Sequence, residues 1–237
     1  MQLIDRPRDL YPLVSVDIAL FCIEDHRLKV LLVQRATEPH ANCWALPGGV
    51  LRPDIDDSLE AAAVRVLRQK ISVEIPYLAE VCTYSGPMRD PRGWSISTLY
   101  YALLPRDKIT AVVANRIEAI KWEDAEPLGQ RLAFDHDLQL AAALQLLREK
   151  VEGHALPLHL MPELFTLTQL QNTCEAILGK GQKLDKSVFR RRIKGHPDLT
   201  PTDQEERGRQ RPALLYRARN GFCFERFRQQ TNGQSDE

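Results

Sequence analysis

The apolar positions of the first 150 residues follow two different spacings. Runs rich in β-branched and aliphatic residues predict strands at 14–23, 28–34, 78–84, 94–104 and 119–122. The polar stretch 24–27 between the first two runs indicates a β-hairpin. Apolar residues that recur at helical spacing predict helices at 58–71 and 137–149. The first 150 residues are therefore expected to form a domain in which strands and helices are mixed.

A change of composition after residue 150 marks a second domain. Gly and Pro residues in 151–162 indicate a linker between domains that cover 1–150 and 163–237. In the second domain, a Thr-x-x-Gln capping pattern, present in two overlapping registers, begins an apolar helical stripe that ends at Gly179. A second short helix is expected over 186–194. Two short helices joined by a Gly-containing turn are typical of a helix-turn-helix.

The residues that follow the second helix predict a wing. Two strand-like runs, 213–218 and 222–227, are joined through Asn220 and Gly221, and Asn-Gly is a strong hairpin signal. The charged residues 195–212 that precede these runs are expected to form a loop. A helix-turn-helix followed by a β-hairpin is a winged helix.

A formal net charge of zero hides an uneven distribution of charge. Residues 163–237 carry 14 Lys and Arg against 10 Asp and Glu, a net charge of +4, and the rest of the chain is at −4. Within 180–194 there are seven basic residues and one acid, Asp185, which can cap the second helix. Such a concentration of positive charge is a candidate footprint for nucleic acid, although a solvated helix face has the same pattern.

Length and cysteine usage narrow the class of protein. The chain of 237 residues is long enough for one large or two ordinary domains. It has neither an apolar run long enough to cross a membrane nor a signal-peptide pattern at its N-terminus. No C-x-x-C pair occurs among the dispersed cysteines, which are Cys22, Cys43, Cys82, Cys174 and Cys223. They indicate neither a zinc site nor a disulfide framework, and a reducing cytoplasm fits best.

The segment 47–73 keeps the outline of a catalytic motif. A Pro-Gly-Gly loop enters a helix on which seven residues separate Asp57 from Arg65, and this arrangement resembles the Nudix box of pyrophosphohydrolases. In that family the Arg is followed by one Glu and then by a pair of Glu residues, which bind divalent cations. The corresponding places in this sequence hold Val66, Gln69 and Lys70.

The loss of these carboxylates argues against catalysis. Mg²⁺ binds carboxylate oxygens and bridges them to substrate phosphates, and Val, Gln and Lys cannot take that part. We therefore expect no metal site and no enzymatic activity. The remaining acids, Asp54, Asp56, Asp57 and Glu60, suit a helix N-terminus that is capped by Ser58 or Asp57. In the alternative, Asp56, Asp57 and Glu60 rebuild a metal site in a shifted register, and the chain is an active Nudix hydrolase of ADP-ribose or a related nucleoside diphosphate derivative.

Four further motifs extend the resemblance over nearly the whole chain. They are FDHD at 134–137, FTLTQLQ at 165–171, FRRR at 189–192 and RPALLY at 211–216. With the degenerate box and the winged helix, they resemble NrtR, the Nudix-related transcriptional regulators of bacterial NAD metabolism. The resemblance implies an α+β chain with an N-terminal Nudix α/β/α sandwich and a C-terminal winged helix. It also implies a homodimer, ADP-ribose as the effector ligand, and repression of NAD biosynthesis or salvage genes that the ligand relieves. No cofactor is expected, and a dimer is expected to read a pseudo-palindromic operator.

A pocket for ADP-ribose needs cations and backbone N–H groups for the phosphates and a surface on which a ring can stack. The candidate residues are Arg35, Gly48, Gly49, Arg52, Arg65, Arg92, Trp94 and His136. Several have a structural alternative: Arg35 as a surface charge, Arg65 as an ion pair that anchors its helix, and Trp94, like Trp44, as a core residue. His136 either caps the last helix of the domain or lines the pocket.

The candidate DNA contacts lie mainly on the second helix of the winged helix. Base reading is assigned to Ser187, Arg190 and Arg191, because Arg can read the major-groove edge of guanine. Phosphate contact is assigned to Lys183, Lys186, Lys194, Arg211 and Arg219, and Thr168 and Gln169 at the start of the first helix complete the set. In the remaining alternative the chain is an adaptor whose basic tail binds RNA or protein.

Overall fold

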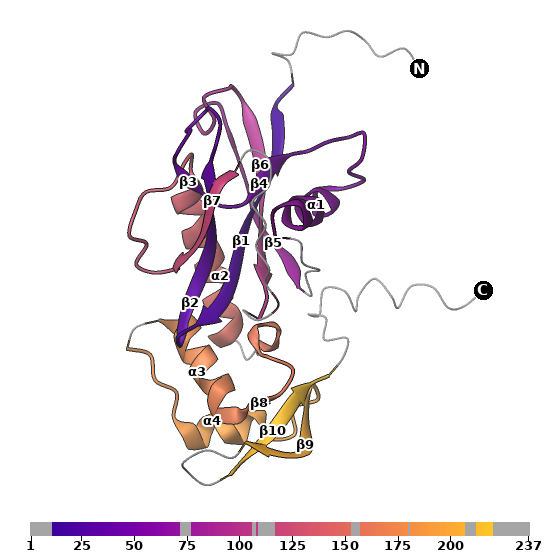
Figure 1. Ribbon diagram of the computed structural model, residues 1–237, viewed down its shortest axis with the longest axis vertical. Coiled ribbons are helices and arrows are strands. Elements are labelled where there is room, and N and C mark those ends of the chain that lie inside the picture. The colour runs from indigo at the N-terminus through magenta and orange to yellow at the C-terminus, as the bar shows by residue number, and fades with distance from the viewer. Residues whose placement is uncertain are drawn as a thin grey trace, which may run out of the picture.

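The computed structural model describes residues 11–71, 77–105, 108, 117–152, 157–179, 181–206 and 212–219. These residues form two domains that follow one another along the long axis of the molecule (Figure 1). None of the helices in these ranges is both long enough and apolar enough to span a bilayer.

One seven-stranded sheet forms the centre of the N-terminal domain. Its strands are β1 (Leu13–Glu24), β2 (Arg27–Arg35), β3 (Trp44–Ala45), β4 (Gly48–Val50), β5 (Leu78–Gly86), β6 (Ser95–Leu103) and β7 (Ile117–Asp124). The helices of the domain are α1 (Leu59–Ile71) and α2 (His136–Glu152). The predicted strands and helices of this domain are confirmed, with their ends shifted by a few residues.

β1 and β2 form the predicted hairpin. Glu24 pairs with Arg27, so that Asp25 and His26 make a two-residue turn. Both turn residues have positive φ, 51° and 58°. Positive φ at both central positions is the type I′ geometry, whose twist matches that of antiparallel strands.

The two helices cover opposite faces of the sheet (Figure 1), and β1 contributes side chains to the core on each face. Successive side chains of a strand point to opposite faces. Toward α1, β1 contributes Val16, Ile18, Leu20 and Cys22, which pack with Ala62, Ala63 and Leu67. Toward α2 it contributes Ala19 and Phe21, which pack with Leu140, Ala143, Leu144 and Leu147. The implied α/β/α sandwich is therefore confirmed.

The segment 44–50 lies where β1 and β2 diverge. Residues 21–24 of β1 pair with β2, whereas residues 15–17 of β1 pair with β4 and residues 33–34 of β2 pair with β3. The Pro-Gly-Gly stretch was expected to be a loop, and this was wrong for its glycines. Gly48 and Gly49 lie in β4 because the edge of β1 is open to backbone pairing there.

The C-terminal domain is a winged helix, as predicted. It contains the 3₁₀ turn η3 (Leu158–Leu160), β8 (Phe165–Thr166), α3 (Leu167–Leu178), α4 (Lys186–Ile193), β9 (Leu199–Glu206) and β10 (Ala213–Ala218). Its three strands form a sheet in the order β8-β10-β9. The buried cluster that joins helices and sheet consists of Leu158, Met161, Phe165, Leu170, Cys174, Phe189 and Ile193.

Both helices of the helix-turn-helix start at the caps that the sequence indicates. Thr166 Oγ1 accepts a hydrogen bond from the Gln169 amide at 3.2 Å, and Gln169 Oε1 accepts one from the Thr166 amide at 2.7 Å. This reciprocal capping box selects the first of the two possible registers. At α4, Asp185 Oδ1 accepts from the amides of Ser187 and Val188 at 3.0 and 2.8 Å. Gly179, with φ 93°, ends α3.

The wing is built differently from the prediction. Residues 199–206, expected within a loop, form β9 and pair antiparallel with β10, the predicted strand 213–218. The polar sequence of this segment gives no strand signal, because all eight of its side chains are at least partly exposed and none forms a buried apolar face. The second predicted strand, 222–227, lies outside the described residues.

The two domains meet where α2 packs against α3. Ile177 of α3 belongs to the same buried cluster as Leu144 and Leu147 of α2. The Arg148 Nε of α2 also donates a hydrogen bond to the Ile177 carbonyl at 3.1 Å. Of the expected linker, 151–152 continue α2 and 158–161 pack into the protein.

Candidate functional site

A cavity of about 610 Å³ opens where β1 and β2 diverge. Its walls come from these strands, from 44–50, from α1, from the loop 87–94 and from the start of α2. Seven of the eight candidate ligand residues line it: Arg35, Gly48, Gly49, Arg52, Arg65, Arg92 and His136. Residues from six separate parts of the sequence thus meet at one hollow.

Trp94 is the exception among the candidates. It is absent from the cavity wall, and half of its surface is exposed, so it is not a core residue either. Its backbone carbonyl accepts a hydrogen bond from the Leu13 amide at 2.9 Å, which places it at the entrance to β1 and β6. Trp44 is partly buried and carries the Lys121 ammonium 4.5 Å above its ring.

The glycines of β4 allow its backbone to approach the cavity floor. A Cβ atom on Gly48 would overlap the Asp17 carboxylate, and one on Gly49 would lie 2.7 Å from Val66 Cγ2. Any larger residue would push β4 away from β1 or from α1. The two glycines therefore fix the depth of the cavity at this wall.

Asp17 is the centre of a buried polar network beneath the cavity. Its Oδ2 accepts hydrogen bonds from Ser97 Oγ at 2.6 Å and from Gln139 Nε2 at 3.1 Å. His136 accepts a hydrogen bond at Nδ1 from the Leu46 amide at 2.9 Å, so its proton is assigned to Nε2, which lies 3.5 Å from Asp17 Oδ1. Burial lowers the pKa of His136, which favours the neutral ring. His136 thus ties α2 to the strand segment 44–50.

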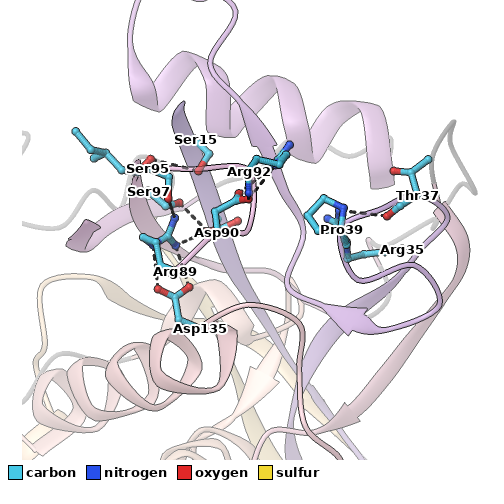
Figure 2. A network of polar contacts seen from close by, with 12 residues as sticks. Ser15, Arg35, Thr37, Pro39, Arg89, Asp90, Arg92, Ser95, Ser97 and Asp135 are labelled. Atoms are coloured by element: carbon cyan, nitrogen blue, oxygen red, sulfur yellow. Dashed lines mark hydrogen bonds and ion pairs between the residues drawn. The ribbon is translucent and has the colours of Figure 1, made fainter. Parts of the chain in front are cut away.

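Two arginines hold the loop 87–94, and the sequence analysis predicted only one of them. Arg89, which it missed, makes a bidentate pair with Asp135 at 3.0 and 2.9 Å and lies 3.8 Å from Asp17. Arg92, which it selected, makes a bidentate pair with Asp90 at 3.0 and 2.6 Å. Figure 2 shows both pairs, with Arg89, Asp90 and Arg92 on this loop and Asp135 just before α2. Burial opposes ionisation of Asp90, but the hydrogen bonds from Arg92 outweigh it and hold the pKa of Asp90 below its ordinary value.

Arg65 is paired with Asp56 and not with Asp57, the acid at the box spacing. Its Nε and Nη2 each lie 2.6 Å from an Asp56 carboxylate oxygen, and Asp56 Oδ2 also accepts from the Arg52 amide at 2.7 Å. These bonds lower the pKa of Asp56, while Asp57 is exposed. Arg65 therefore anchors α1 and also forms part of the cavity wall.

The donor set of the cavity does not fit a divalent cation. Val66 is buried against the sheet. The wall has three carboxylates: Asp17 accepts the hydrogen bonds described above, Asp90 is paired with Arg92, and Glu38 is exposed. Arginines outnumber these acids. Across the described ranges, no three His, Cys, Asp or Glu side chains are grouped as a metal site requires.

The Ser58 hydroxyl accepts a hydrogen bond from the Ala61 amide at 3.0 Å, which makes Ser58 the cap of α1.

The winged helix presents a second candidate site on α4. Phe189 and Ile193 are buried against the domain, and the opposite face exposes Lys186, Ser187, Arg190, Arg191 and Lys194. Ser187 also donates its hydroxyl to the Asp185 carboxylate, as part of the cap. The predicted base readers thus share one exposed face of the second helix.

The other predicted DNA contacts are more scattered. Thr168 is exposed, while the Gln169 side chain belongs to the capping box and Lys183 is paired with Glu175 at 2.7 Å. Arg219 is exposed just after β10, and Arg211 lies outside the described residues. The side chains of Gln169 and Lys183 are therefore already engaged in contacts within the protein.

Comparison with known proteins matches both halves of the chain. Residues 12–145 match the NUDIX domain family, and residues 157–218 match the NrtR DNA-binding winged helix domain. An ADPR responsive transcriptional repressor, NtrR, from Acinetobacter baylyi is 42% identical over 207 residues, which cover 87% of this chain and 82% of the relative.

Solved structures are similar to the chain as a whole and to its first domain. The crystal structure of Shewanella oneidensis NrtR complexed with a 27mer DNA matches with a TM-score of 0.78 and 35% identity, over 87% of this chain and 93% of that chain. The NUDIX domain of the same protein complexed with ADP ribose matches with a TM-score of 0.54 and 36% identity, over 60% of this chain and 94% of that chain.

Proposed function

The chain belongs to the NrtR family of Nudix-related transcriptional regulators, and from this premise we propose that it is a transcriptional repressor whose binding to DNA is controlled by ADP-ribose. One observation carries the proposal: a single chain joins an arginine-lined Nudix cavity without a metal-ligand set to a winged helix with an exposed basic helix. The relatives support both halves, since one is named as an ADPR responsive repressor and another was solved both with DNA and with ADP ribose.

The cavity suits the chemistry of ADP-ribose. Two phosphates need cationic and N–H donors, which Arg35, Arg52 and Arg92 supply together with the β4 backbone. The riboses need polar partners, which the Asp17 network beneath the cavity can supply. The volume of about 610 Å³ falls in the range of small-molecule sites.

We further propose that ADP-ribose is bound without being hydrolysed. Hydrolysis of a diphosphate bond by the Nudix reaction needs a cation held by carboxylates, and the wall formed by Val66 and Gln69 provides none. A ligand that survives binding reports its own concentration. The alternative, an active hydrolase, requires Asp56 as a metal ligand, yet Asp56 is engaged by Arg65.

On the DNA side, α4 is proposed to enter the major groove as a recognition helix. Arg190 and Arg191 are suited to guanine edges, and Lys186 and Lys194 to phosphates. A homodimer would place two such helices on a pseudo-palindromic operator, at half-sites one helical turn or a multiple of it apart. The proposed targets are NAD biosynthesis or salvage genes, and the proposed compartment is the cytoplasm.

We assign the coupling between the two sites to α2. Its first residue, His136, lines the cavity, and Arg148, one turn before its end, bonds to α3 of the winged helix. Its 17 residues form a rigid connection of about 25 Å. A ligand that moves His136 or the Arg89–Asp135 pair therefore moves the base of the winged helix. Such coupling is typically worth about 1 to 3 kcal/mol.

A single titration tests the proposal. ADP-ribose is added, in the presence of Mg²⁺, to the protein bound to a duplex selected from a randomised DNA pool, and the nucleotide is then analysed by chromatography. Release of DNA with intact ADP-ribose is the expected result. Release accompanied by AMP would identify a hydrolase, and absence of any selected duplex would exclude a sequence-specific DNA-binding function.

A further inference from the structure

Five arginines line the cavity, and four of them have a carboxylate partner. The pairs are Arg65 with Asp56 at 2.6 Å, Arg89 with Asp135 at 2.9 Å, Arg92 with Asp90 at 2.6 Å and Arg52 with Asp54 at 3.6 Å. Over the part of the chain that the structure describes, Arg35 has no carboxylate within 4 Å. It is therefore the cavity cation whose charge the protein leaves uncompensated at contact distance.

Neutral groups hold the Arg35 guanidinium in place. Its Nε donates to the Pro39 carbonyl at 2.8 Å and its Nη2 to the Thr37 carbonyl at 3.4 Å, as Figure 2 shows. No partner among the described residues accepts from Nη1. Burial lowers the pKa of Arg35, and the nearby positive charge of Arg92 lowers it further. A guanidinium stays protonated at neutral pH under such shifts, so Arg35 is a half-buried cation with no counter-ion at contact distance among the described residues.

The face of the Phe134 ring packs against the Arg35 guanidinium. The Arg35 Cζ lies 4.7 Å from the centroid of the Phe134 ring, within the range of a cation–π contact. The His40 ring meets Phe134 edge-on at 4.6 Å, and the His136 ring lies 5.4 Å away. Two neighbours and the cation thus fix the orientation of the ring.

The backbone of Phe134 is unusual for its residue type. Its φ of 55° lies in the left-handed region, where a bulky side chain is rare and strained. Such strain persists where the surroundings over-determine the conformation, and it is concentrated at ligand clamps. In this conformation Phe134 lines the cavity and its ring lies under the Arg35 guanidinium.

We propose that Phe134 is a positioning residue, which holds the Arg35 guanidinium with Nη1 directed toward a phosphate of the bound nucleoside diphosphate. The proposal rests on the ligand class of the proposed function but not on DNA binding. The phosphate supplies the counter-ion that Arg35 lacks, and the cation–π contact keeps the guanidinium from turning toward Asp17 or Asp90, whose charges act on it at longer range.

The test is a double-mutant cycle read by calorimetry. The whole chain and its Arg35→Gln, Phe134→Leu and doubly substituted variants are titrated with ADP-ribose, ADP and adenosine. Arg35→Gln is expected to weaken ADP-ribose and ADP about tenfold to 100-fold, the effect of one lost charged hydrogen bond or two, and to change adenosine binding less than about twofold. Phe134→Leu is expected to weaken the two diphosphates about threefold to tenfold, and to add nothing when Arg35 is already Gln.

Two further variants separate the ring from the backbone. Phe134→Tyr keeps the ring and is expected to retain diphosphate binding. Phe134→Asn removes the ring but accepts positive φ more readily, so it should behave like Phe134→Leu if the ring matters. Melting temperatures check that each variant is folded.

The outcomes distinguish this inference from the proposed function. A wild-type chain that binds no ADP-ribose would refute the proposed function. If the wild type binds, the inference is overturned by equal losses for adenosine and ADP in Phe134→Leu, by additive effects in the double variant, or by wild-type affinity in Phe134→Asn, while the proposed function stands.

Discussion

Replacing Arg148 with Gln should weaken the communication between the cavity and the winged helix. Arg148 makes two kinds of contact. Its Nε donates to the Ile177 carbonyl at 3.1 Å across the domain junction, and its Nη2 pairs with Glu126 within the first domain. Ile177 lies in the last turn of α3, where carbonyl groups have no partner inside the helix. Arg148 therefore caps α3 from the other domain.

The size of the effect follows from which contact matters. The Glu126 side chain is 57% exposed, and an ion pair this open to solvent contributes little. The bond to Ile177 is partly buried, and a hydrogen bond of this kind contributes about 1 kcal/mol net, since its donor is charged but partly hydrated. If the bond is present in one state of the protein and broken in the other, its loss lowers the coupling by that amount. This is about a fivefold smaller effect of ADP-ribose on DNA affinity.

Fluorescence anisotropy measures the coupling directly. A labelled operator duplex is titrated with protein at fixed salt, with and without saturating ADP-ribose, and the ratio of the two dissociation constants is compared between variants. Arg148→Gln should reduce the ratio about fivefold. Glu126→Gln, the matched control, should change it less than about twofold. An unchanged ratio in Arg148→Gln, or an equal fall in Glu126→Gln, would refute the assignment of coupling to this bond.

Three other substitutions have defined outcomes. Arg190→Ala should weaken binding to a selected operator by about 1 to 3 kcal/mol, and an unchanged affinity in gel-shift titrations would show that Arg190 reads no base. Thr166→Ala removes half of the capping box and should lower the free energy of unfolding in urea by about 1 kcal/mol; a difference within error would mean that the box adds no stability. The hydrogen bonds from Arg65 lower the pKa of Asp56, so their stabilisation is complete above about pH 4 and is lost as the pH falls through the lower pKa of the folded state. Asp56→Asn should therefore melt at a lower temperature at neutral pH and show a weaker acid dependence, and parallel melting curves of the two proteins against pH would contradict this.

Local patterns predicted the elements that bury a face. The run 14–23 reads as a strand because both of its faces enter a core, and α1 reads as a helix because its small and aliphatic residues share a stripe. The caps of α3 and α4 could also be predicted, because each capping side chain accepts hydrogen bonds from amides two or three residues further along the chain. Features that depend on residues close together in the chain could therefore be predicted from the sequence.

The parts that the sequence did not reveal depend on distant partners. β4 and β9 have little strand character of their own and form by pairing with β1 and β10. Arg89 gave no signal because its partner, Asp135, lies 46 residues away, and the uncompensated charge of Arg35 is visible only once every neighbouring carboxylate has been placed. Arg65 pairs with Asp56, although Asp57 is the acid at the box spacing. A spacing rule cannot anticipate such a shift.

The proposed coupling through α2 also sets the concentration of ADP-ribose at which the protein responds. Free energies of coupling act in both directions, so a ligand that lowers operator affinity by some factor is itself bound more weakly, by the same factor, when the operator is in place. Under the proposed function, the DNA-bound protein needs a higher concentration of ADP-ribose for half-saturation than the free protein does. Operators of different strength would then be vacated at different nucleotide levels, and one sensor could switch several genes in sequence as the nucleotide accumulates.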